Sequence, residues 1–248
     1  MRTNISYLAL AASLAFASVV PSLAADSAPS VDSILAKHVE AMGGKAALEK
    51  ITSRVIKVKL ESATFGGGEG EITAKAPNKQ HSQIDITGVG PITEGFDGKV
   101  AWAKSSFDGL REKSGEELAK TKRDADFYKE VDLKKTYPDL TYKGTEKVEG
   151  AEALVLESKP GGSGKERLFF DPKTYLMVRQ ESTLEGPQGS VTIMLSPGDY
   201  KAVDGVKVPQ TLKYQFGQGG NTIEFTIKIV DVKHNVEVPD SKFAKPSA

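Results

Sequence analysis

The spacing of apolar residues divides the chain into a helical opening and a long series of strands. Near the start, apolar residues recur at intervals of three and four, which predicts an amphipathic helix that ends at Gly43-Gly44. Its apolar positions are Val31, Ile34, Leu35, Val39 and Met42. Lys45 to Ile51 offers a short helical continuation. From Arg54 onward the period changes to two, so we expect strands with one face in water.

The same alternation returns often enough to predict about eleven strands. The alternating apolar sets are Ile56 to Leu60, Ile84 and Ile86, Val100 and Trp102, Leu154 and Leu156, Leu168 and Phe170, Val191 to Leu195, Leu212 to Phe216, and Ile223 to Ile229. Turn signals such as Asp97-Gly98 separate these runs. The glycines from Gly66 to Gly68 join two β-patterned runs and predict the tip of a hairpin.

One segment, residues 114–133, interrupts the strand pattern and predicts a mid-chain helix. A serine at its start is followed three residues later by Glu117, which is the spacing of a capping box. Leu118 lies on the apolar face of this helix. Its acidic residues, Asp124 and Glu130 among them, alternate with lysines, so we expect them to form a solvated face.

These elements predict one mainly β domain over residues 26–248, because no proline-rich or low-complexity linker divides the chain. A large antiparallel sheet with one apolar face must roll into a barrel or be covered. A helix is about 10 Å wide and strands are spaced about 4.8 Å apart, so two helices cover only a small part of such a sheet. We therefore expect part of the concave apolar face to remain as a cavity.

The first residues have the pattern of an export signal. Leu8 to Val20 is an unbroken apolar and small-residue run, which is shorter than the roughly 20 residues that span a bilayer. Pro21 and the small residues after it predict cleavage after Ala24 or Ala25, so residues 1–25 are the predicted signal peptide. Because the chain has no cysteine, it cannot carry a lipoprotein anchor. We expect a mature protein in the periplasm.

Composition and motifs exclude several classes of chemistry. The chain has 33 basic and 33 acidic side chains, so no net charge favours a nucleic acid. Without cysteine there is no disulfide, thiolate nucleophile or iron–sulfur cluster. The histidines, His38, His81 and His234, have no neighbouring ligands at metal spacing, and neither HExxH nor GxSxG occurs. We therefore expect a protein that is not an enzyme, with no catalytic residue, metal or cofactor.

The apolar stripes have two interpretations that share the same residues: packed core, or the lining of a ligand cavity. On the second interpretation, strand parity selects nine lining positions: Ile56, Val58, Ile84, Trp102, Phe170, Ile193, Phe216, Phe225 and Ile227. The helices supply three candidate lid contacts: Leu35, Val39 and Leu118. The volume left inside the sheet decides between the two interpretations.

Several segments resemble the periplasmic lipoprotein-carrier superfamily of the LolA, LolB and RseB-like fold, especially its divergent lipoprotein-sorting members. They are Ile34 to Leu48, Glu94 to Trp102, Leu168 to Val178, Ser196 to Pro209 and Asn235 to Pro246, the last including Phe243. The resemblance implies an unclosed antiparallel β-barrel of about eleven strands, with helices on its open side and a hydrophobic cavity for acyl chains. No residue here matches the arginine that positions cargo in the better-known carriers.

The sequence thus favours a soluble, monomeric carrier of lipid acyl chains, such as those of lipoproteins, that moves them between membranes and exchanges them with membrane-bound donor and acceptor proteins. Nucleic acid is not an expected partner. The alternative is an envelope-sensing or protein-interaction module without enzymatic activity, in which the same barrel is only a scaffold.

Overall fold

The computed structural model describes residues 28–64, 66–159, 164–186 and 189–247. The predicted signal peptide and its cleavage site lie outside the described residues. Within these ranges, no helix is long and apolar enough to cross a membrane.

Thirteen of the described strands form one antiparallel sheet, in the order β6-β5-β4-β3-β2-β1-β15-β14-β11-β10-β9-β8-β7. In the N-terminal half, the strands are β1 Ser53–Ser62, β2 Gly66–Lys75, β3 Lys79–Ile86, β4 Gly90–Phe96, β5 Ala101–Ser105 and β6 Gly109–Glu112. In the C-terminal half, they are β7 Thr141–Val148, β8 Ala151–Ser158, β9 Lys165–Phe170, β10 Met177–Gly186, β11 Gly189–Gly198, β14 Thr211–Gln218 and β15 Asn221–His234. A separate hairpin pairs β12 Lys201–Val203 with β13 Val206–Val208.

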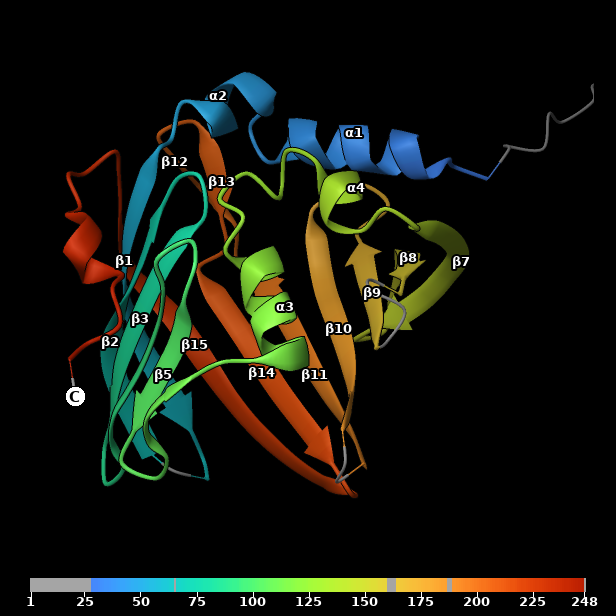
Figure 1. The fold of residues 1–248 in the computed structure, drawn as a ribbon. Helices are drawn as coiled ribbons and strands as arrows, with labels where there is room; N and C mark the ends of the chain where they lie inside the picture. Colours follow the sequence, from blue (N-terminus) through green and yellow to red (C-terminus); the bar gives the residue numbers. More distant parts are fainter. Residues whose placement is uncertain (1–27, 65, 160–163, 187–188, 248) are drawn as a thin grey trace, which may run out of the picture.

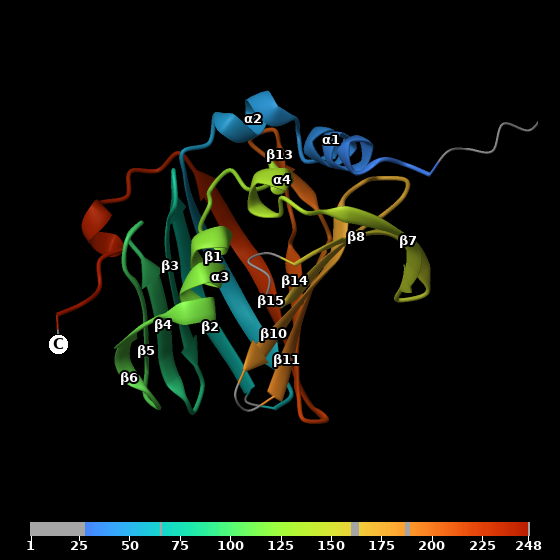
Figure 2. The same ribbon diagram turned by 45° about the vertical axis from the view of Figure 1, so that its right-hand side comes forward.

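The long strand β15 joins the two halves of the sheet, since it pairs with β1 on one side and β14 on the other. Ile227, for example, lies between Leu60 of β1 and Leu212 of β14. The sheet curls around α3, while its edge strands β6 and β7 do not pair with each other (Figures 1 and 2). This architecture confirms the prediction of a mainly β, unclosed antiparallel barrel, although the strand number is higher than expected.

The sequence predicted too few strands partly because of β2. Glycines occupy positions in β2 where apolar residues would otherwise mark a strand. The prediction of a hairpin tip at Gly66–Gly68 is wrong, because these residues already pair with β1. At Gly70, a Cβ would lie 2.1 Å from the carbonyl oxygen of Gln83 on β3. Only glycine lets the two backbones approach this closely.

The predicted opening helix is present as α1 Val31–Ala41 and α2 Lys45–Glu49. The Ser30 hydroxyl accepts a hydrogen bond from the Ser33 backbone N–H at 3.1 Å, which caps the first turn. Gly43 and Gly44 both have positive φ values and separate the two helices, as the sequence predicts. Both helices lie across one end of the curled sheet (Figure 1).

The single helix predicted over residues 114–133 is wrong; the segment forms α3 Gly115–Asp124 and α4 Leu133–Thr136 with turns between them. The helix ends because Asp126 accepts a hydrogen bond from the Tyr128 backbone N–H, and the Phe127 N–H donates to the Pro77 carbonyl. Glu117 does not form the capping box and instead binds Arg111. These tertiary contacts were not visible in the helical spacing.

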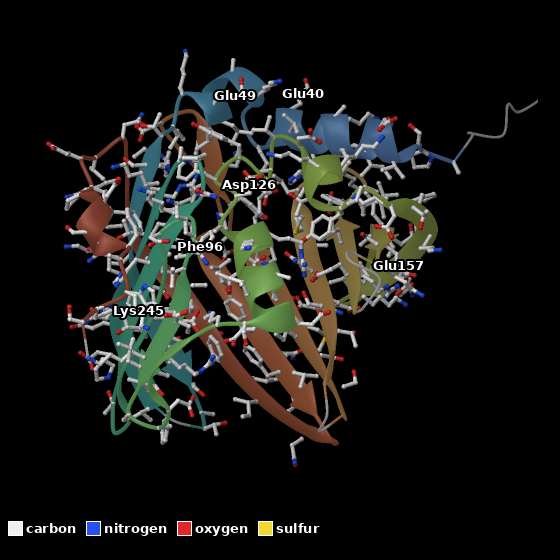
Figure 3. The ribbon with its side chains drawn as sticks, viewed as in Figure 1. Glu40, Glu49, Phe96, Asp126, Glu157 and Lys245 are labelled. Atoms are coloured by element: carbon white, nitrogen blue, oxygen red, sulfur yellow. The ribbon has the colours of Figure 1, made fainter. Side chains whose placement is uncertain are left out.

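The concave face of the sheet is packed at two places. Under α1 and α4, the buried cluster comprises Ile34, Leu35, Leu133, Tyr137, Leu154, Leu156, Leu168, Phe170 and Met177. Under α3, Phe96 and Ala101 pack with Ala125 and Leu118. Figure 3 shows Phe96 between the first strands of the sheet and α3. The strands between these two covered regions face the space that α3 partly fills.

The C-terminal segment covers the outer face of the N-terminal strands, where a short 3-10 helix spans Asp240–Lys242 (Figure 2). The Trp102 indole N–H donates to the Phe243 carbonyl at 3.1 Å. On the neighbouring strand, a Cβ at Gly95 would lie 2.4 Å from the Trp102 ring. The outer layer therefore depends on the absence of a side chain at Gly95.

We expect Gly95→Ala to lower the free energy of unfolding by about 1–3 kcal/mol, because the added methyl group must displace the indole. Urea denaturation followed by the fluorescence of Trp102, the only tryptophan in the chain, measures this. Gly198→Ala is the control, since a Cβ there meets no atom within 4 Å. An unchanged denaturation midpoint for Gly95→Ala would contradict the proposed packing.

Candidate functional site

A hollow inside the curled sheet is the main candidate site. It consists of two cavities of about 260 and 380 Å³. Both are lined by Gln80, Asp124, Lys129, Gln180 and Leu195, so the two cavities adjoin. By its lining residues, the larger lies between α3 and the strands opposite it, and the smaller reaches toward α1 and β13. Ligand pockets typically occupy about 300–1,000 Å³, a range that the two cavities together reach.

One wall of the larger cavity is apolar and comes from β11 and β14. Ile193 and Leu195 pair with Phe216 and Tyr214 across these strands, and all four line the cavity. Phe225 of β15 stacks on this wall, with its ring centroid 5.0 Å from that of Tyr214 and 5.7 Å from that of Phe216. The near-parallel rings form a continuous aromatic surface inside the sheet.

The opposite wall is polar and comes from α3 and the turns after it. Asp124 forms an ion pair with Lys120 at 2.9 Å. Beyond the end of α3, Glu130 contacts Nε2 of His38 at 3.0 Å, while Nδ1 of His38 donates to the Tyr175 carbonyl at 2.9 Å. This pair ties α1 to the turns that border the hollow.

The polar wall keeps its charges despite burial. Burial alone would raise the pKa of Glu130, but the hydrogen bond from His38 and the charges of Lys129 and Arg54 hold it below its ordinary value. Burial would lower the pKa of Lys129, yet Asp124, Glu130 and other carboxylates raise it. Burial raises the pKa of Tyr214 to about 12, so its hydroxyl stays protonated at neutral pH.

Two of the nine predicted lining residues, Ile193 and Phe216, line the larger cavity. Phe225 stacks against that wall. Ile56 lies on the β1 face that carries Arg54, which lines the smaller cavity. By the same parity, three more of the nine predicted residues lie on the concave face. Val58 pairs with Gly70, Ile84 with Ile92, and Ile227 with Leu212. A ligand contact at these positions stays a prediction.

Trp102 and Phe170 lie elsewhere. Trp102 follows Ala101, which faces α3, so its side chain points to the outer face of the sheet and lies under the C-terminal segment. Phe170 is fully buried, with its ring centroid 5.0 Å from that of His38 on α1. Parity misplaced Trp102 by one residue and could not show that α1 fills the space beside Phe170.

The three predicted lid residues all hold helices against the sheet. Leu35 belongs to the cluster under α1, and Leu118 packs on Phe96 and its neighbours. Val39 packs against the cluster formed by Met42, Leu48, Ile51, Val206 and Val208. Movement of these helices as a lid stays a prediction.

The polar residues of the hollow were missed by sequence reasoning. Lys129, Asp124 and Glu130 were expected on a solvated helical face, but the break after α3 turns them inward. Gln80 and Gln180 carried no signal, since an isolated glutamine in a strand is ordinary. Tyr214 was recognisable, because it alternates with Leu212 and Phe216. In the part of the chain that the structure describes, no group of three or more histidine, cysteine or acidic residues is arranged to hold a metal ion.

Comparison with solved structures identifies the fold. A DUF1329 family protein from Desulfovibrio piger matches with a TM-score of 0.56 and 12% identity over 88% of this chain and 98% of its own. A Vibrio parahaemolyticus domain described as an outer membrane lipoprotein-sorting protein matches with a TM-score of 0.54 and 15% identity over 85% and 96%. A LolA superfamily protein from Nitrosomonas europaea matches with a TM-score of 0.53 and 13% identity over 88% and 99%.

The chain shares the fold of these three proteins, one of which is described as a LolA superfamily protein. The resemblance noted in the sequence is therefore confirmed for the architecture. Comparison by sequence adds nothing further, since no family model and no curated protein matches the chain.

We expect Glu130→Gln to lower the free energy of unfolding at neutral pH by about 1–3 kcal/mol, because His38 loses its charged partner. The depressed pKa of Glu130 contributes stability above the ordinary glutamate pKa of 4.5, and this is lost as the pH falls further through the folded value. The variant should therefore lose less stability on acidification below 4.5 than the wild type.

Urea denaturation over a pH series measures this difference. Glu40→Gln serves as the control, since Glu40 is an exposed carboxylate on α1. Parallel pH profiles for the wild type and Glu130→Gln would contradict a stabilising role for the His38–Glu130 pair.

Proposed function

We propose that this protein is a non-catalytic carrier that binds an acyl chain in the hollow between α3 and strands β10, β11 and β14. The observation that carries the proposal is the apolar wall of Ile193, Leu195 and Phe216 beside a 380 Å³ cavity. Packed protein interiors leave few voids larger than a water molecule. A space of this size is therefore not expected in a core that serves only to stabilise the fold.

The energetics favour direct transfer between apolar phases. Each methylene group withdrawn from water contributes about 0.8 kcal/mol, so a chain of about fifteen methylenes gains roughly 12 kcal/mol before costs. Such a chain would leave for water very slowly. Transfer to a membrane or to another binding protein is nearly neutral in free energy, because the chain exchanges one apolar environment for another.

The arrangement of the helices supplies a route for the chain in this proposal. Helices α1 and α3 pack on the sheet through two separate hydrophobic clusters. The His38–Glu130 pair links α1 to the turns beside the hollow. Displacing either helix would widen the hollow while the β1–β15 pairing keeps the sheet intact. Closure behind the chain would then exclude water from it.

The cellular part of the proposal is export. With the predicted signal peptide removed after Ala24 or Ala25, the mature chain would act in the periplasm and move lipid or lipoprotein acyl chains between membranes. The Vibrio parahaemolyticus domain with the same fold is described as an outer membrane lipoprotein-sorting protein, which is consistent with this role.

We expect a fluorescent long-chain fatty acid to bind the wild-type protein, and Phe216→Ala to weaken its binding about tenfold to a hundredfold. Loss of a buried phenylalanine contact removes about 1.5–3 kcal/mol, and 1.4 kcal/mol corresponds to a factor of ten. Fluorescence titration at constant protein concentration measures the dissociation constants.

Phe107→Ala is the matched control, since Phe107 is 76% exposed on the loop between β5 and β6. It should leave the affinity unchanged. No binding to the wild type, or equal weakening by both substitutions, would refute the hollow as the acyl-chain site and favour a scaffold that binds protein partners.

A further inference from the structure

Several polar side chains of the larger cavity form a first set that is already paired. Asp124 forms an ion pair with Lys120 at 2.9 Å. The Ser182 hydroxyl donates to the buried Glu166 carboxylate at 2.7 Å, and the Gln180 amide donates to the same carboxylate at 3.2 Å. These groups have partners inside the protein and need none from a ligand.

A second set of polar side chains at this cavity includes Lys129, Gln80 and Tyr214. All three line the larger cavity, and Lys129 and Gln80 line the smaller one as well. With the residues that the structure describes, none of these three side chains makes a hydrogen bond or an ion pair within 4.0 Å. The ring of Tyr214 is stacked on Phe225, so only its hydroxyl is left for a polar contact.

The chemistry of this second set is one-sided. Its one charge is positive: the ammonium group has three donors and no acceptor, while the tyrosine hydroxyl and the glutamine amide can each donate or accept. The counterpart that satisfies such a set is a compact group with several acceptor oxygens and a negative charge. Carboxylate and phosphate both have this chemistry.

The carboxylates near Lys129 do not take the place of such a ligand. Asp124 is paired with Lys120, and Glu130 is paired with His38. Both nevertheless raise the pKa of Lys129 above its ordinary value, which keeps the ammonium charged inside the cavity. Lys129 is thus a charged donor with no bonded partner among the described residues, beside an apolar wall.

We propose that Lys129, together with Gln80 and Tyr214, binds the anionic headgroup of an amphiphile whose chain lies on Ile193 and Phe216. This inference rests on the proposed function and names its ligand class: a chain that ends in a carboxylate or a phosphate, as in a free fatty acid or a phospholipid. A neutral lipid can accept hydrogen bonds through its oxygens, but it brings no negative charge to the Lys129 ammonium.

The test compares three ligands with the same twelve-carbon chain, namely laurate, dodecyl phosphate and dodecanol, as competitors of a fluorescent fatty acid. Lys129→Met replaces the side chain by an unbranched, uncharged one that is only one atom shorter. We expect it to weaken the binding of at least one anionic ligand tenfold or more, equivalent to about 1.4 kcal/mol, and to leave dodecanol unchanged. Lys129→Arg should retain the preference for the anion.

The control is Lys122→Met, which replaces an exposed lysine of α3 that lines neither cavity and should change none of the affinities. A urea denaturation midpoint for each variant shows that it is folded. A Lys129-dependent preference for laurate alone assigns a fatty acid, and one for dodecyl phosphate alone assigns a phospholipid headgroup; both support the proposal.

Equal affinities for all three ligands, unaffected by Lys129→Met, would overturn the headgroup site while leaving the acyl-chain site intact. If none of the ligands binds the wild-type protein, the proposed function itself fails. The two failures are therefore distinguishable in the same experiment.

Discussion

The structure depends on a mismatch between a wide apolar sheet face and the narrow helices that cover it. A helix is about 10 Å across, which matches about two strands at a spacing of about 4.8 Å. Here α1 and α4 cover the region of β8 to β10, and α3 covers β4 and β5. The strands between these regions have an apolar surface, which includes Ile193 and Phe216. The protein's own side chains leave a cavity beside this surface.

The same mismatch explains which site residues the sequence could predict. Strand parity depends only on the two-residue repeat, so it placed Ile193 and Phe216 on the concave face without any knowledge of the fold. It could not show which concave positions a helix covers, and Phe170 is buried against α1 for that reason. Trp102 was misplaced because the register of a short strand beside a tight turn depends on its partner strand. Most of the fold was predictable from periodicity, whereas the lining depends on tertiary packing.

The polar half of the hollow was hidden for a different reason. Charges interleaved at helical spacing are typical of a solvated surface, and residues 114–133 have that pattern. Helix α3 ends after Asp124 because the next backbone N–H groups bond elsewhere. The Tyr128 N–H donates to the Asp126 side chain, and the Phe127 N–H donates to the Pro77 carbonyl. That break directs Lys129 and Glu130 toward the interior, where ionised side chains are unusual unless they are paired or serve a ligand. An acyl carrier for ligands with a charged end would combine these two halves.

A crystal structure of the protein with a long-chain fatty acid tests this account most directly. The account predicts electron density for the chain between α3 and the wall formed by Ile193, Leu195 and Phe216, with the sheet otherwise unchanged. It would be contradicted by a structure at saturating ligand in which side chains fill the hollow, or in which the chain lies on the outer face of the sheet.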